Sequence, residues 1–186
     1  MSNNFHRFTV KAQEALQNAQ DFVARMNHGE LKAIHLLRAL LDDGQSLVQP
    51  MLVRSEVNMQ DLEKGIAEEL ERLPKVFAGG GAVSQLYLSQ ELVKILDQAA
   101  DIAAKQNDEF VSCEHLALAL FDIPSKAQEI LVQAGAKRDV LIKTLAQLRG
   151  SAKVTDPMPE SKFQVLEKYA VRLTEEARKG KLDPVI

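Results

Sequence analysis

The chain has 186 residues, of which 46% are hydrophobic and 26% are charged, as in ordinary soluble globular proteins. Its formal net charge of -3 argues against a nucleic-acid partner and against an anionic membrane surface, because both attract a basic face. The single cysteine, Cys113, excludes an intrachain disulfide and a cysteine-based zinc cluster.

The N-terminal residues 1–7 lack the apolar segment of a secretory signal, and no apolar run approaches the roughly 20 residues of a membrane span. A cytoplasmic location is therefore expected. The good helix formers Ala, Leu, Gln, Glu and Lys dominate the composition, and strand-like alternation is not sustained anywhere. The sequence predicts an all-α chain.

An internal repeat organises the chain. A shift of 80 residues aligns residues 9–42 with residues 89–122 without a gap and with ten identities in 34 positions, and an offset of 79 extends the match to residues 49–64 and 128–143. The first segment of each copy carries apolar residues at i, i+3, i+4 and i+7, which predicts a helix with one apolar stripe. Two such copies are expected to pack their stripes into a single core.

Each copy contains four predicted helices. They lie near residues 9–26, 33–41, 47–55 and 59–72 in the first copy, and near 89–106, 113–121, 126–134 and 138–149 in the second. Several helix starts carry a side-chain oxygen that can accept a first-turn N–H group: Thr9, Asn58, Ser89 and Ser112. Two further starts have the spacing of a capping box, namely Ser46 with Gln49 and Ser125 with Gln128.

Two segments interrupt the helical pattern. Residues 74–85 contain Gly79, Gly80 and Gly81, which predict a flexible hinge or surface loop. Residues 150–160 hold two prolines and no apolar periodicity, which predicts a flexible linker. A ninth helix is expected from residue 161 to about residue 179, and the chain stops at residues 182–186 as a truncated protein would. We therefore predict one eight-helix domain over residues 1–149, with repeat one at about 8–72 and repeat two at about 88–149, followed by the linker.

Catalytic chemistry is not indicated by any motif. Cys113 and His115 stand two positions apart on a predicted helix, where side chains do not face each other. His35 and His115 are repeat-equivalent, which favours a shared structural role near a helix start over a ligand role. The glycine segment lacks the Lys-Ser/Thr of a phosphate-binding loop. No catalytic residue, metal ligand or cofactor is predicted for this chain, which we expect to be a binding module that does not itself hydrolyse ATP.

The doubled four-helix unit, with His-Leu near the start of the second helix of each copy, resembles the Clp N-terminal repeat domain. Within that family the chain is most similar to the ClpB-type protein disaggregases, on the evidence of residues 8–12, 72–76 and 173–186. The last of these stretches is similar to the beginning of the first AAA+ ATPase domain of Clp ATPases, so residues 161–186 are identified as the start of such a domain.

The resemblance implies a function. ClpB-type proteins are homohexameric, ATP-driven stress-response chaperones that work with the Hsp70-type system to disaggregate and refold proteins. Their N-terminal module captures exposed apolar segments of unfolded or aggregated polypeptides and delivers them to the pore of the hexamer. ATP and Mg²⁺ would be bound by the parent protein, in which Val185 and Ile186 would lie against the adenine.

Two other functions remain open at this point. The chain is also compatible with the adaptor-binding N-terminal module of a protease-linked Clp unfoldase. A long coiled-coil insertion in the first ATPase domain would mark the disaggregase, and a protease-docking loop in the second would mark the unfoldase. A hydrolytic or metal enzyme on a helical scaffold is disfavoured because no suitable set of side chains is present.

The resemblance also implies where clients bind. Two repeats packed through their apolar stripes leave a groove between them, which suits an extended apolar peptide. The resemblance places the polar rim of this groove at Thr9, Asp108 and Glu114. Each of these residues has a structural interpretation as well. Thr9 is a possible helix cap, Asp108 a possible turn residue, and Glu114 an acid that favours a helix N-terminus.

Overall fold

The computed structural model describes residues 4–76, 87–150 and 152–159, and it confirms the all-α prediction of two four-helix repeats. Repeat one contains α1 (Val10–Met26), α2 (Ala33–Asp42), α3 (Val48–Arg54) and α4 (Met59–Arg72). Repeat two contains α5 (Gln90–Lys105), α6 (Cys113–Asp122), α7 (Lys126–Gln133) and α8 (Arg138–Arg149). The predicted boundaries of these eight helices agree with the described ones to within one residue at each end.

The helix starts follow from capping chemistry. Thr9 Oγ1 accepts the Ala12 N–H at 3.2 Å, and Ser89 Oγ accepts the Leu92 N–H at the same distance, as predicted. Asn58 Oδ1 accepts two first-turn N–H groups of α4, which is also as predicted. These contacts satisfy backbone donors that have no partner within the helix.

The two predicted capping boxes are not formed as expected. Leu47 holds the N-cap position of α3, and Ser46 Oγ accepts the Val48 N–H at 3.4 Å instead of serving as the cap. Ser125 does cap α7 through the Gln128 N–H, but Gln128 Nε2 donates to the Phe121 carbonyl at 2.7 Å and does not return to Ser125. A carbonyl left free at the end of α6 therefore competes for the side chain that the spacing assigns to the box.

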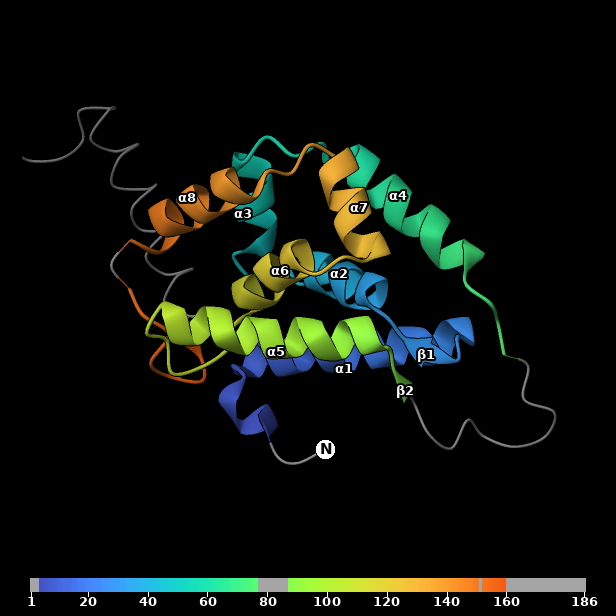
Figure 1. Cartoon of the computed structure of the whole chain (residues 1–186), viewed down its shortest axis with the longest axis horizontal. Coiled ribbons are helices and arrows are strands. Elements are labelled where there is room, and N and C mark those ends of the chain that lie inside the picture. The colour runs from blue at the N-terminus through green and yellow to red at the C-terminus, as the bar shows by residue number, and fades with distance from the viewer. Residues whose placement is uncertain (1–3, 77–86, 151, 160–186) are drawn as a thin grey trace, which may run out of the picture.

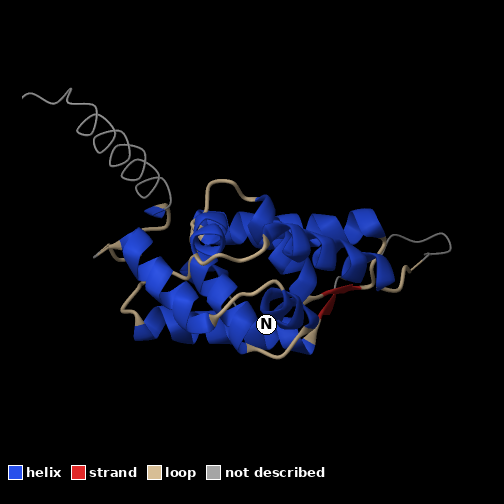
Figure 2. Ribbon diagram, turned by 90° about the horizontal axis from the view of Figure 1, so that it is seen from above, coloured by secondary structure: helices blue, strands red, loops and turns tan. Residues whose placement is uncertain are grey.

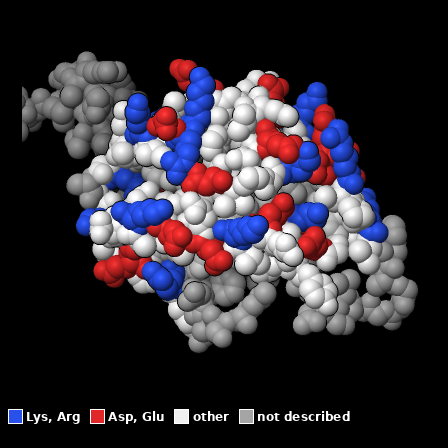
Figure 3. Space-filling model, in the orientation of Figure 1, with Lys and Arg blue, Asp and Glu red and all other residues white. Residues whose placement is uncertain are grey.

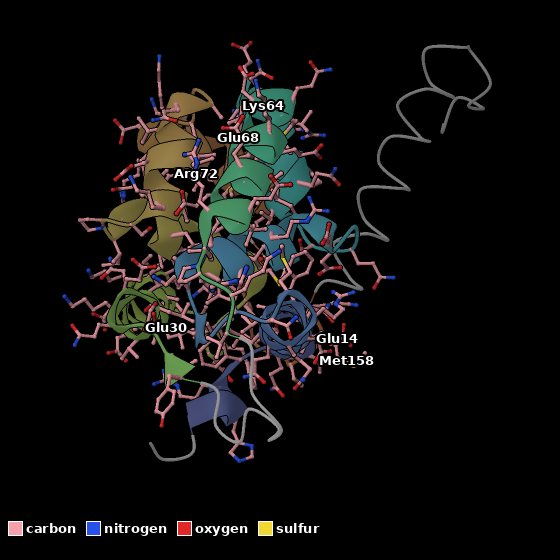
Figure 4. The ribbon with its side chains drawn as sticks, turned by 90° about the vertical axis from the view of Figure 1, so that its right-hand side faces the viewer. Glu14, Glu30, Lys64, Glu68, Arg72 and Met158 are labelled. Carbon is pink, nitrogen blue, oxygen red and sulfur yellow. The ribbon has the colours of Figure 1, made fainter. Side chains whose placement is uncertain are left out.

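The two repeats pack with an approximate twofold relationship (Figure 1). Helix α4 packs against α7, and the repeat-equivalent pair α8 and α3 pack against each other in the same way. Helices α2 and α6 contact each other at the centre. Helices α1 and α5 run along one side of the domain, and Figure 4 shows both of them end-on. The repeat-equivalent residues Leu36, Leu116, Leu40 and Leu120 are fully buried, so the repeats share one core.

Short β pairings connect loop segments of the two repeats. The two-residue strands β1 (Glu30–Leu31) and β2 (Tyr87–Leu88) are parallel and join the loop after α1 to the start of α5 (Figure 2). The equivalent bridge in the other direction pairs Phe8 with Val111. Pairings this short contain no alternation of residue types, so periodicity did not predict them. A 3₁₀ helix, η1 (Asn4–Arg7), precedes α1 and was also not predicted.

The segment after α8 makes contacts with the domain, and its flexibility stays a prediction. Residues 152–159, expected to form part of a flexible linker, lie against the domain, and Val154 is completely buried. Backbone hydrogen bonds hold the segment in this position, and they need no apolar periodicity. The glycine segment 79–81, the predicted helix beyond residue 160 and the residues Val185 and Ile186 lie outside the described residues.

The surface carries charges of both signs. Basic and acidic side chains are interspersed on the face shown in Figure 3. On α4, Glu68 lies between Lys64 and Arg72, one turn away on either side, with N–O distances of 4.0 and 3.5 Å (Figure 4). Such exposed pairs contribute little to stability. Within the described residues, no helix is both long enough and apolar enough to span a bilayer.

Candidate functional site

The three residues of the predicted client site lie at one end of α1. The Thr9 N–H donates to the Val111 carbonyl at 2.9 Å, which brings the start of α1 against the loop between α5 and α6. Asp108 lies in that loop, and Glu114 lies in the first turn of α6. All three residues are buried, with 0%, 5% and 1% of their surface exposed, whereas the sequence led us to expect a polar rim.

Asp108 is the centre of a buried hydrogen-bond network. Its carboxylate accepts from Arg149 Nη2 at 2.7 Å, from His115 Nε2 at 3.0 Å and from the Val154 N–H at 2.8 Å. Burial by itself raises the pKa of Asp108, but the hydrogen bonds from His115, Val154 and Arg149 outweigh it and lower that pKa to about 2. Asp108 is therefore ionised at neutral pH. Besides its position in a turn, it accepts hydrogen bonds from Arg149, His115 and Val154.

The histidine tautomer follows from the backbone. The Ser112 N–H donates to His115 Nδ1 at 3.0 Å, so that nitrogen is unprotonated and Nε2 carries the hydrogen that is donated to Asp108. This contact is the side-chain half of a capping box in which His115 takes the place usually held by Glu or Gln. Gln106 Oε1 accepts from Arg149 Nη1 at 2.9 Å and completes the network.

Repeat one holds an equivalent arrangement without the carboxylate. The Lys32 N–H donates to His35 Nδ1 at 3.0 Å, and His35 Nε2 lies 2.8 Å from His28 Nδ1. Burial lowers the pKa of both rings, with that of His35 falling to about 4, and the neighbouring ring of His28 adds to the effect at His35. The shared structural position predicted for His35 and His115 is confirmed. Only repeat two has a buried charge at this place.

Glu114 is the least satisfied polar residue of the cluster. Neither of its carboxylate oxygens has a hydrogen-bond partner within the described parts of the chain. The nearest cation is Arg149, whose Nε lies 3.9 Å from Glu114 Oε1 and whose side chain is only 7% exposed. Arg149 therefore stands between two buried carboxylates. Two acceptor oxygens remain without a donor, although buried acceptors are normally paired.

Arg149 was missed by the sequence analysis. Its position in the last turn of α8, just before Gly150, is typical of a residue that interacts with a helix C-terminus. Its partner Asp108 is 41 residues away in the sequence, and no local pattern links the two. Val154 was missed for a similar reason, because its role depends on its backbone N–H and carbonyl groups.

A cavity of about 350 Å³ adjoins the network. Its polar wall consists of Gln106, Asp108 and Arg149, and its apolar wall is formed by residues of α8, namely Ile142, Leu145 and Ala146. Ala152 and Lys153 also line it. The cavity therefore lies within repeat two and the segment that follows it, whereas the sequence predicted a groove between the repeats. In the described ranges, no three His, Cys, Asp or Glu side chains come together to hold a metal ion.

Known structures share the fold. The Hsp104 N-terminal domain from Candida albicans matches with a TM-score of 0.71 and 22% identity, covering 82% of this chain and 98% of that one. The N-terminal domain of the caseinolytic protease associated chaperone ClpD from Arabidopsis thaliana matches with a TM-score of 0.59 and 19% identity, covering 80% and 99% of the two chains. At these identities the likeness concerns the fold alone.

Sequence relatives identify the family. The chaperone protein ClpB of Pseudomonas putida is 37% identical over 180 residues, which is 97% of this chain and 21% of the relative. ClpB of Porphyromonas gingivalis is 36% identical over 183 residues, which is 98% of this chain and again 21% of the relative. The chain thus spans about a fifth of the length of these relatives. The family model of the Clp repeat (R) N-terminal domain matches residues 7–134, more than half of the sequence, and the chain therefore belongs to the Clp N-terminal repeat domain family.

Proposed function

We propose that this chain is the substrate-recognition N-terminal module of an ATP-dependent ClpB-type chaperone that disaggregates stress-damaged proteins. It would capture exposed apolar segments of unfolded or aggregated polypeptides and pass them to the pore of a homohexamer that cooperates with an Hsp70-type system. The likeness to ClpB chaperones over 97–98% of this chain supports the assignment. In this proposal ATP and Mg²⁺ act in ATPase domains of the parent protein, where Val185 and Ile186 would contact the adenine.

The observation that carries the binding role is the convergence of Thr9, Asp108 and Glu114 at one end of α1. An extended polypeptide offers a row of backbone N–H and C=O groups to whatever it binds. The carboxylates of Asp108 and Glu114 are acceptors for its N–H groups, and the two oxygens of Glu114 have no donor of their own within the described residues. We assign these side chains a role in orienting the client, with apolar burial supplying most of the affinity. Such binding is expected to be weak, since a disaggregase accepts many sequences and releases them.

A second function is favoured by one observation. The fold is shared with ClpD, which is described as a caseinolytic protease associated chaperone. An adaptor-binding module of a protease-linked Clp unfoldase would therefore have the same architecture. Under this alternative a folded adaptor, and not an unfolded client, would be the ligand of the domain.

The test is an NMR titration of the ¹⁵N-labelled chain with reduced, carboxymethylated α-lactalbumin, a permanently unfolded polypeptide. Glu114→Gln keeps the shape of the side chain and removes its charge, and we expect it to weaken binding roughly tenfold, the effect of one hydrogen bond to a charged group. Glu109→Gln is the matched control, because Glu109 is an exposed acid in the loop that precedes α6, and its side chain should not matter.

Thermal melts must show that both variants remain folded. Amide shifts are expected at residues 9–10 and 108–114. Equal affinity of all three proteins, or shifts confined to the glycine segment around Gly80, would contradict this assignment of the site. Absence of any binding would contradict the proposed function itself.

A further inference from the structure

Residues 152–159 cross the gap between the start of α1 and the loop after α5. We call this segment the exit strand. It is anchored at both sides of the gap by main-chain hydrogen bonds. The Val154 carbonyl accepts from the Glu109 N–H at 2.9 Å, and the Pro157 carbonyl accepts from the Val10 N–H at 2.8 Å. Met158, the residue after Pro157, is labelled beside Glu14 of α1 in the view of Figure 4.

The groups that the exit strand satisfies would bind any extended chain. Val10 is the first residue of α1, so its N–H has no acceptor within the helix. The Glu109 N–H is a loop donor, and Asp108 Oδ1 accepts from the Val154 N–H at 2.8 Å. One residue of the exit strand is thus held through both its N–H and its C=O. None of these contacts depends on the identity of a side chain.

The side chains of the exit strand contribute at few positions. Val154 and Pro159 are buried and Ala152 is half-buried, whereas Thr155, Pro157 and Met158 are exposed. A segment held by a few backbone hydrogen bonds and two buried side chains, those of Val154 and Pro159, is held less firmly than a helix of the core, because each such bond contributes little net free energy in water. Another extended chain is therefore able to replace it.

Repeat one provides the comparison. At the offset of 79 residues, Lys75 corresponds to Val154, and its segment also returns to the loop after the first helix, where the Val76 N–H donates to the Asn27 carbonyl at 2.7 Å. Lys75 is exposed, however, and Val76 is 46% exposed. The corresponding segment of repeat one, at Lys75 and Val76, therefore contacts the domain without burying either side chain. The buried apolar position and the carboxylate beside it belong to repeat two alone.

We propose that the exit strand occupies the client site in cis, and that a client binds in extended form by displacing it. The client residue that replaces Val154 would carry a small or β-branched apolar side chain, with its N–H on Asp108 and its C=O on the Glu109 N–H. A carbonyl three residues further along the client would meet the Val10 N–H. This inference rests on the proposed function, and it adds the shape of the client and the reason why Asp108 is buried in the absence of one.

The experiment compares three forms of the full chain in binding reduced, carboxymethylated α-lactalbumin: the unaltered protein, Val154→Gly and Thr155→Gly. Both substitutions replace a β-branched residue with glycine at adjacent positions, so they change backbone entropy alike, but only the first removes a buried side chain. The apparent affinity for the probe is proportional to the fraction of molecules in which the exit strand has left the site. A substitution that increases this fraction therefore increases the affinity by the same factor. We expect Val154→Gly to bind roughly threefold or more tightly than Thr155→Gly, because both gain the same backbone freedom and only Val154→Gly loses a buried side chain.

A second measurement needs no substitution. In the unaltered ¹⁵N-labelled chain at saturating probe, the amides of residues 152–156 and of Met158 should move to the shifts of an unstructured chain, which a synthetic peptide of residues 151–160 provides. If these amides keep their free positions, or if the three proteins bind equally, the exit strand is not the occupant, although the proposed function stands. If none of the three proteins binds the probe, the proposed function fails and this inference fails with it.

Discussion

His28 and Asp108 occupy equivalent positions in the two repeats, and each faces a repeat-equivalent histidine. Both follow an asparagine in the left-handed region, Asn27 at φ 56° and Asn107 at φ 57°. The ring of His28 lies 2.8 Å from His35, and the carboxylate of Asp108 lies 3.0 Å from His115. One scaffold therefore carries a neutral pair in repeat one and a charged network in repeat two. We therefore expect the two repeats to lose stability in different ranges of acid pH.

The histidine pair should make the domain less stable below neutral pH. The folded-state pKa of His35 is about 4, against 6.5 for an unperturbed histidine. A lowered pKa means that the unfolded chain takes up the proton first, so stability present above pH 6.5 is lost as the pH falls towards 4. The loss between pH 7 and pH 5 should be on the order of 2 kcal/mol.

Urea denaturation at the two pH values measures this loss. His35→Gln retains an acceptor for the Lys32 N–H and should show a smaller pH difference than the unaltered chain. The exposed His6 provides the control, and His6→Gln should keep the full difference. An unchanged difference in His35→Gln would show that the pair is not its source.

The stability contributed by the Asp108 network should not change between pH 7 and pH 5. Asp108 has a lowered pKa of about 2, so the stability it contributes is present above pH 4 and is lost only as the pH falls from about 4 to about 2. Asp108→Asn at pH 7 should cost about 3–5 kcal/mol, because it leaves Arg149 buried without its closest partner. Asp122→Asn is the control, since its partner Arg138 is 44% exposed and that pair should contribute about 1 kcal/mol or less. Equal losses in the two variants would mean that the buried network has no special role in stability.

Gly65 of α4 lies against Ile130 of α7. A Cβ atom at this position would lie 2.9 Å from Ile130 Cγ2. Alanine favours a helix over glycine by about 1 kcal/mol, but we expect Gly65→Ala to be destabilising by about 1–3 kcal/mol through this contact. In an Ile130→Ala background the same change should become neutral or stabilising, and a double-mutant cycle by denaturant unfolding measures the coupling. If the two substitutions changed the free energy of unfolding additively, Gly65 and Ile130 would not interact.

A buried hydroxyl pair joins the repeats on the opposite side. Ser55 at the end of α3 lies 3.0 Å from Thr144 of α8, oxygen to oxygen, and both residues are buried. Thr144→Val keeps the shape but leaves the Ser55 hydroxyl without its partner, which should cost about 1–2 kcal/mol. Adding Ser55→Ala should recover part of the loss, whereas Thr144→Ser should retain the bond. If the double variant is less stable than Thr144→Val, the pair does not contribute in this way.

The sequence by itself determined the repeat and its eight helices. Local signals were sufficient, because a 3.6-residue apolar stripe and a capping oxygen act within one or two turns, as Thr9 and Ser89 show. The family resemblance brought Thr9, Asp108 and Glu114 to attention as one site. Local signals could not say that these residues would be buried.

Only the tertiary structure decided how the site is completed. Arg149 reaches Asp108 across 41 residues of sequence, and Val154 reaches it across 46. The first contact depends on how α8 packs beside the α5–α6 loop, and the second uses a backbone N–H that every residue except proline possesses. Long-range packing and backbone hydrogen bonding leave no periodic trace in a sequence. For this reason residues 152–159 resemble a linker when read as sequence, yet in the folded chain Val154 hydrogen-bonds to Asp108 and Glu109.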